Sequence, residues 1–394
     1  NIGGRTSHSA IMARSLEIPA VVACKTITEE VKDGDLIVLD GIEGTVMINP
    51  DEATVKEYET KCAEFIAYKE ELKKLVNEKT ITTDGHQVEL VANIGSAKDL
   101  AGVKENGGEG VGLFRSEFLF MESDAIPSEE AQFEAYKKVA IALNGKPVII
   151  RTLDIGGDKE IPYMGLEKDE NPFLGYRAIR LCLDRKEDIY KPQLRALLRA
   201  SAYGNIRIMI PLVTCIDELR EAKALIEEIK AELDEKNIAY KKDIQVGIMV
   251  ETAAASLIAD IFAKEADFFS IGTNDLTQYT MSVDRGNKKV SYLYSTFNPA
   301  VLRSIRHIIA CGREAGIMVG MCGEAASDPM MIPLLLAFGL NEFSMSASAI
   351  LRARKMVTEY SVEELQTVAD KAMSFATTAE VEDYMRKFVE KITG

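Results

Sequence analysis

From about residue 80 onward, short apolar runs alternate with longer amphipathic stretches. Most of the apolar runs lack regular polar alternation, as expected of parallel strands that are buried on both faces. The stretches between them, such as 217–236 and 298–315, predict helices. The predicted strands are 88–94, 110–115, 148–153, 206–213, 244–250, 267–272, 317–321 and 342–346.

This alternation predicts an α/β fold of the (β/α)8 TIM barrel type, because the pattern continues through eight strands. The alternative is a doubly wound open sheet. It is less favoured because no Gly-x-Gly-x-x-Gly segment follows the first strand.

The segment before the barrel has a different pattern. A short helix is predicted at 9–17, and strand-like runs follow at 20–23, 36–39 and 44–48. Apolar positions spaced by three and four then predict one long connecting helix over 51–79. We therefore expect three parts: a small domain at 1–50, a linker helix at 51–79 and the barrel at 80–394.

Composition narrows the classes of partner. The formal net charge of -15 argues against a nucleic acid or an anionic membrane as partner. No apolar run approaches the roughly 20 residues of a membrane span, and no signal peptide is visible. The six cysteines are scattered without metal spacing, which favours reduced thiols and a cytoplasmic location. Because the first residue is not Met, we expect a fragment or a processed form.

Charged and polar residues follow most of the predicted strands, at the end where barrels of this type build their active sites. Solvent exposure alone does not explain charged residues after so many strands at the same end of the barrel. These residues are Arg115, Arg151, Glu251, Asn274, Asp275 and Cys322.

The arginines predict an anion site. Arg115 and Arg151, with Arg177 and Arg285 from loops, have planar guanidinium groups suited to phosphate or carboxylate oxygens. For each arginine alone, a structural salt bridge is an equal alternative. The glycine-containing segment 154–159 is a further but weak phosphate signal.

The acids and the cysteine predict different chemistry. Glu251 and Asp275 follow neighbouring strands, a usual way to hold Mg²⁺ beside a substrate phosphate. Cys322 is either a buried structural thiol or a proton donor or acceptor, because a thiol pKa can be tuned.

His8 is the third candidate centre. It follows two glycines and two hydroxyl residues at the start of the predicted helix 9–17. Free N–H groups and the helix dipole would stabilise a phosphoryl group on its ring, and neutral imidazole is a competent nucleophile. The alternative is a capping or surface histidine.

Several long motifs share one resemblance. They resemble the phosphoenolpyruvate-protein phosphotransferases, enzyme I of the bacterial sugar phosphotransferase system, over essentially the whole chain. The motifs lie at 3–14, 112–119, 151–159, 171–177, 272–278, 283–286 and 321–324.

The resemblance implies a two-part reaction in the barrel mouth, with Mg²⁺ on Glu251 and Asp275. His8 attacks the phosphorus of phosphoenolpyruvate and becomes phosphohistidine. Cys322 then protonates the enolate at its methylene carbon, which gives pyruvate. The phosphoenolpyruvate-binding residues implied by the resemblance are Arg115, Arg151, Arg285, Asn274 and Asp275, with Arg177 assisting.

The resemblance also implies partners and a domain order. Residues 1–50 correspond to part of a swivelling phosphohistidine domain, and the family dimerises through the barrel. The helical domain that docks the phosphocarrier protein is missing, so we expect transfer to that carrier only in the full-length form. Two alternatives stay open: a non-catalytic dimeric phosphoenolpyruvate-binding module, and a relative of pyruvate phosphate dikinase or phosphoenolpyruvate synthase. The latter would require a nucleotide-grasp domain, of which the chain has no trace.

Overall fold

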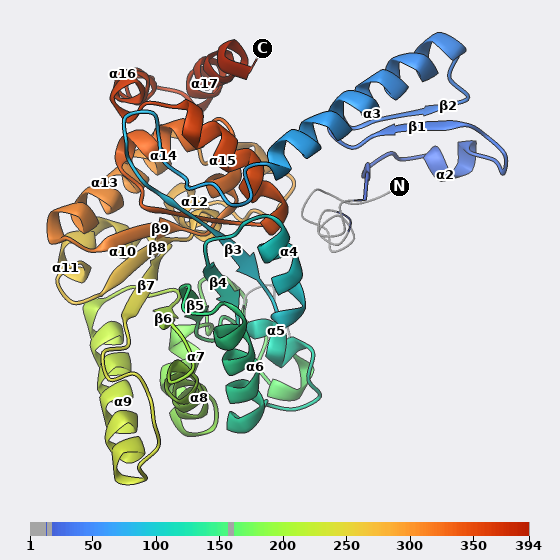
Figure 1. Cartoon of the computed structure of the whole chain (residues 1–394). Helices are drawn as coiled ribbons and strands as arrows, with labels where there is room; N and C mark the ends of the chain where they lie inside the picture. Colours follow the sequence, from blue (N-terminus) through green and yellow to red (C-terminus); the bar gives the residue numbers. More distant parts are fainter. Residues whose placement is uncertain (1–12, 14–17, 157–160, 394) are drawn as a thin grey trace. The chain divides into compact units, whose positions relative to one another are not determined.

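The computed structural model describes residues 13, 18–156 and 161–393 and forms two compact units, Asn1–Asn77 and Glu78–Gly394 (Figure 1). The first unit contains helix α2 (Ile27–Glu30) and an antiparallel hairpin of β1 (Ile37–Asp40) and β2 (Thr45–Ile48). Asp40 stabilises the hairpin turn, because its Oδ1 accepts the amides of Ile42 and Glu43 at 2.8 and 2.9 Å.

Residues 20–23 do not form the predicted strand. Ala23 has a φ of 62°, a left-handed conformation that cannot continue an extended strand. The predicted helix at 9–17 lies outside the described residues, apart from Ala13.

The long predicted helix is present as α3 (Glu52–Lys73). Asp51 caps it by accepting the amide of Thr54 at 2.8 Å. The helix is shorter than predicted. Beyond Lys73 the chain changes to tighter turns, such as the bond from the Leu75 amide to the Leu72 carbonyl at 2.9 Å.

The second unit is a closed barrel in which neighbouring strands are all parallel. The last strand pairs with the first, which removes the open edges of the sheet. The predicted (β/α)8 architecture is therefore confirmed. The strands are β3 (Glu89–Ile94), β4 (Val111–Arg115), β5 (Val148–Arg151), β6 (Ile206–Ile210), β7 (Val246–Val250), β8 (Phe268–Ile271), β9 (Met318–Met321) and β10 (Glu342–Met345).

Helices surround the strands (Figure 1). The predicted helices at 217–236 and 298–315 are confirmed as α9 (Ile216–Glu235) and α13 (Pro299–Ala315). The other α-helices described in this unit are α4 (Leu100–Glu105), α5 (Glu117–Met121), α6 (Glu129–Ala142), α7 (Ile179–Asp184), α8 (Lys191–Ser201), α10 (Ala253–Leu257), α11 (Ala259–Phe262), α12 (Thr273–Met281), α14 (Ile332–Phe338), α15 (Ile350–Glu359), α16 (Val362–Met373) and α17 (Thr378–Thr393).

The core of the barrel has two layers. A large apolar cluster fills the space between the strands and the helices. A smaller cluster fills the inside of the ring with Leu113, Ile149, Met209, Met249, Phe268 and Cys322. Since each fully buried aliphatic side chain contributes about 1.5–3 kcal/mol, the two layers hold the strand ends firmly in place.

Two further properties bear on the class of protein. Within the described part of the chain, no helix combines the length and apolar content needed to cross a membrane. All six cysteines carry free thiols, and Cys182, Cys311 and Cys322 are the buried ones.

Candidate active site at the carboxyl ends of the strands

The predicted site residues of the barrel all lie at the carboxyl ends of strands or in the loops beyond them. Arg115 and Arg151 are the last residues of β4 and β5. Glu251 directly follows β7, Asn274 and Asp275 begin α12 just after β8, and Cys322 directly follows β9. Arg177 and Arg285 come from loops.

Arg151 is held by carboxylates in the barrel mouth. Its side chain is buried, and its Nη2 pairs with Glu117 Oε1 and lies 2.9 Å from Asp154 Oδ2. Its Nη1 also contacts the sulfur of Met249 inside the barrel at 3.7 Å. The guanidinium is therefore fixed from three sides.

Arg177 pairs with two acids that are far apart in the sequence, Asp154 and Asp275. Its Nη2 lies 2.8 Å from Asp154 Oδ1 and 3.2 Å from Asp275 Oδ2. Its Nη1 donates to the hydroxyl of Tyr279 at 3.2 Å. Arg285 Nη1 lies 3.2 Å from the other oxygen of Asp275, so this carboxylate is shared by two arginines.

The backbone beside this cluster is strained. Ala178, next to Arg177, has φ 51° and ψ -125°, and Leu212 has a φ of 56°. Gly156 has a φ of 103°, and a Cβ at that position would lie 2.5 Å from the Cβ of Arg177. Left-handed non-glycine residues cost free energy and concentrate at functional sites, which supports a functional role for this end of the barrel.

Glu251 is a further buried acid beside the cluster. Its Oε1 accepts the amide of Leu212 at 2.7 Å. Burial, together with the charges of Asp275 and Asp154, raises the pKa of Glu251 to about 8. Buried acids whose ionised forms repel one another are suited to binding a divalent cation.

The oxygen donors of the described residues fit a hard divalent cation that takes its remaining ligands from water and substrate. Glu251 and Asp275 supply carboxylate oxygens. Apart from its ion pair with Arg285, the buried Oδ1 of Asp275 has no hydrogen bond within the described residues. Among the described residues, no group of three or more His, Cys, Asp or Glu side chains forms a metal site. Mg²⁺ is usually bound through one or two carboxylates plus water and substrate phosphate, so two acids are enough.

Cys322 is buried at the centre of the same end. Burial raises the pKa of its thiol to about 11, although Ser270, Arg151 and Arg115 act in the opposite direction. At neutral pH the thiol therefore holds its proton.

Comparison with known proteins identifies the family. The PEP-binding domain of PEP-utilising enzymes matches residues 69–362, and the mobile domain of these enzymes matches residues 1–44. The phosphoenolpyruvate-protein phosphotransferase of Priestia megaterium is 54% identical over 98% of this chain and 67% of its own length. Those of Staphylococcus carnosus (strain TM300) and Bacillus subtilis (strain 168) are 56% and 55% identical, over 99% and 98% of this chain and 68% of their own lengths. The chain belongs to the phosphoenolpyruvate-protein phosphotransferase family.

In this member of the phosphotransferase family, the predicted barrel residues fall into two groups. Arg151, Arg177 and Arg285 are tied to Asp154 and Asp275. The remaining candidates lie outside that network, and Asn274 accepts the Glu324 amide at 3.2 Å through its side-chain oxygen. His8, Gly157, Asp158 and Lys159 lie outside the described residues.

Arg115 differs from the other three arginines. It is half-buried, and within the described ranges its side chain forms no hydrogen bond or ion pair. Its register partner on β5 is Arg151. The barrel mouth therefore holds one guanidinium whose donors are not committed to the described acids.

Four residues of the site were given no role from the sequence. Glu117 and Asp154 hold Arg151, the Tyr279 hydroxyl accepts from Arg177, and Tyr294 donates to the Asn274 carbonyl at 3.0 Å. Glu117 and Asp154 each follow a strand-end arginine closely, and that spacing is a usable signal. Tyr279 lies one helical turn after Asp275, a weaker signal.

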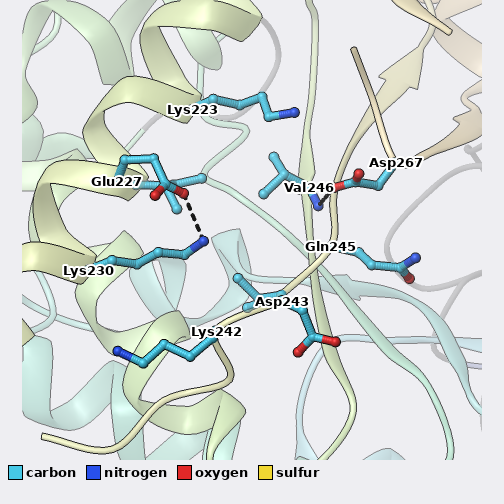
Figure 2. A pocket seen from close by; sticks show the side chains of 10 residues that line it. Lys223, Glu227, Lys230, Lys242, Asp243, Gln245, Val246 and Asp267 are labelled. Atoms are coloured by element: carbon cyan, nitrogen blue, oxygen red, sulfur yellow. Dashed lines mark hydrogen bonds and ion pairs between the residues drawn. The ribbon is translucent and has the colours of Figure 1, made fainter. Parts of the chain in front are cut away.

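The cavity in Figure 2 lies at the other end of the barrel. It has a volume of about 370 Å³ and is bounded by α9 and by the residues that lead into β7 and β8. Its lysines are already engaged: Lys230 donates to Glu227 at 2.8 Å, and Lys223 donates to the Glu265 carbonyl at 2.6 Å. This cavity is therefore no substitute for the barrel mouth as an anion site.

Proposed function

We propose that this chain transfers the phosphoryl group of phosphoenolpyruvate to His8 and releases pyruvate, the first step of the sugar phosphotransferase system. One observation carries the proposal: the arginine and carboxylate cluster at the barrel mouth, in a chain that belongs to the phosphotransferase family. Four guanidinium groups and two facing acids match a small, multiply anionic substrate that arrives with a divalent cation.

The substrate phosphate would be bound by Arg115, Arg151 and Arg285, with Asn274 nearby. Arg115 has no hydrogen bond or ion pair with the described residues, whereas Arg151 is already oriented by Glu117 and Asp154. Arg177 would assist by orienting Asp275. Oriented donors in a buried site favour charge that develops on the phosphoryl oxygens in the transition state.

Glu251 and Asp275 would hold Mg²⁺. The bound ion would neutralise negative charge on the substrate. Its removal should weaken substrate binding, because the carboxyl groups of Glu251 and Asp275 would then face the anionic substrate without a cation between them.

Phosphoryl transfer and proton transfer are separate steps. The bond from phosphorus to the enol oxygen breaks as a phosphorus–nitrogen bond forms to His8. The methylene carbon of the enolate takes the proton of the Cys322 thiol, and the thiolate recovers a proton from solvent. A thiol that is protonated at neutral pH is suited to this role.

Two partners belong to the same proposal. The phosphocarrier protein would receive the phosphoryl group from His8 in the full-length form. The barrel would form a homodimer, and the exposed apolar side chains of Leu257 and Ile261 on α10 and α11 offer apolar surface for it. Sedimentation of wild type and Leu257→Asp would test this part, since a dimer formed through this surface should weaken in the variant.

Calorimetric titration with phosphoenolpyruvate, with Mg²⁺ and with a chelator, tests the main proposal. We expect Mg²⁺-dependent binding that is lost in Arg115→Ala. Lys223→Ala, a cation removed from the opposite end of the barrel, is the matched control and should bind normally. Absence of binding to the wild-type chain would overturn the proposal.

A further inference from the structure

A chain of buried hydrogen bonds connects the outer helices to the strand end that carries Arg151. Its centre is Gln193 on α8, which is 0% exposed. The Gln193 Oε1 accepts the amide of Leu153 at 2.8 Å. Its Nε2 donates to the hydroxyls of Ser116 at 3.1 Å and Tyr136 at 3.2 Å. Both donor hydrogens and the acceptor of this amide are therefore used.

The chain continues on both sides of Gln193. On the barrel side, Ser116 Oγ donates to the carbonyl of Arg151 at 2.6 Å. On the helix side, Tyr136 donates to Gln132, whose side-chain amide donates to the Pro127 carbonyl at 2.9 Å. The side chains of Ser116, Tyr136 and Gln132 are all buried. A network this complete is a rigid one.

The place where the network meets the backbone is the end of β5. The strand stops at Arg151, and the Leu153 amide has Gln193 as its partner instead of a neighbouring strand. A buried amide without a partner is costly, so Gln193 stabilises the conformation of the chain just beyond the strand. Asp154 is the next residue, and its carboxylate contacts both Arg151 and Arg177.

A purely apolar residue would satisfy helix packing equally well at this position. The neighbours of Gln193 on the buried face of α8 are apolar, among them Leu194 and Leu197. A glutamine placed among them is unnecessary for packing alone. It contacts the Leu153 amide directly and the Arg151 carbonyl through Ser116, on either side of Thr152. Those contacts set where Arg151 and Asp154 stand.

We propose that Gln193 is a positioning residue for the phosphoenolpyruvate site: through Ser116 and the Leu153 amide, it fixes the placement of Arg151 and Asp154. The inference rests on the proposed function. It predicts that a substitution that removes the Gln193 hydrogen bonds weakens substrate binding. An equally destabilising substitution elsewhere on α8 should weaken binding far less.

The first test compares Gln193→Met with Leu194→Ala. Methionine has a similar length but none of the hydrogen bonds of glutamine, whereas Leu194→Ala removes buried volume from the same helix and leaves the network intact. We expect the dissociation constant for phosphoenolpyruvate to rise about tenfold or more in Gln193→Met. In Leu194→Ala it should stay within about twofold at a similar loss of stability.

Gln193→Glu adds a readout that a merely structural role would not move. A protonated glutamate accepts the Leu153 amide and donates to Ser116 or Tyr136, whereas an ionised one cannot donate. Relative to wild type, binding in this variant should be nearly normal at low pH. It should weaken as pH rises through the pKa of the new carboxyl.

The outcomes separate the two proposals. Normal binding in Gln193→Met, at a folded state confirmed by circular dichroism, would overturn the positioning role while the proposed function stands. If the wild-type chain fails to bind, the proposed function fails and the positioning role fails with it.

Discussion

Arg115 and Arg151 are register partners at the carboxyl ends of β4 and β5. Of these two arginines, only Arg151 is paired with carboxylates of the described residues. The two arginines therefore have different electrostatic roles. Arg151 completes the electrostatics of a buried cluster, whereas Arg115 adds a cation that the described acids do not neutralise. An anionic substrate would satisfy it.

The first prediction separates these two roles by stability. Arg151→Ala leaves Glu117 and Asp154 buried beside a lost cation, and we expect a loss of about 3–5 kcal/mol in the free energy of unfolding. Arg115→Ala should change it by less than about 1 kcal/mol. Urea unfolding of both variants measures this, and equal losses would contradict the division of roles.

The barrel is predictable from the sequence because most of its strands are buried on both faces and form apolar runs. The ends of the strands are less predictable. The run at 206–213 continues past the end of β6 at Ile210, because Leu212 and Val213 stay buried after the backbone leaves the ladder. Leu212 turns into a left-handed conformation and gives its amide to Glu251. Apolar content alone does not reveal that turn.

The residue types of the site are also predictable, because strand ends converge in a barrel. Their pairing is not. Arg177 reaches Asp275 across 98 positions of sequence, and no local pattern contains that contact. The role of Gln193 is equally hidden, since a single glutamine on an amphipathic helix resembles any other polar position.

The second prediction concerns the cation. In Glu251→Gln the amide oxygen can still accept the Leu212 amide, but one carboxylate of the cation site is gone. We expect the Mg²⁺-dependent part of phosphoenolpyruvate affinity to fall about 10- to 100-fold. Calorimetry with Mg²⁺ and with a chelator measures it. Glu342→Gln, a buried acid at the amino end of β10, is the control and should bind normally.

The third prediction concerns the proton donor. Cys322→Ala should bind phosphoenolpyruvate within about threefold of wild type but release pyruvate about 100-fold more slowly in a single turnover. Because the pKa of this thiol is raised to about 11, the wild-type rate should not fall through loss of the thiol proton between pH 7 and about pH 9. Cys311→Ala on α13 is the control, and pyruvate release at the wild-type rate by Cys322→Ala would exclude this donor.

The fourth prediction concerns Glu342, a fully buried acid that takes no part in the proposed chemistry. Neither of its carboxylate oxygens has a hydrogen bond within the described residues. Burial, followed by the charge of Glu89, raises its pKa from 4.5 to about 8, while Arg207 opposes the shift. The folded protein therefore keeps this proton at a pH where the unfolded chain has released it.

The sign of the effect follows from that difference. The stabilising contribution of the protonated acid is fully present below about pH 4.5 and is lost as pH rises through about pH 8. Glu342→Gln cannot ionise, so its free energy of unfolding should match that of wild type near pH 4. Near pH 9 it should exceed the wild-type value by on the order of 4–5 kcal/mol. Urea unfolding at both pH values measures the difference. A pH-independent difference would show that folding does not raise the pKa of Glu342.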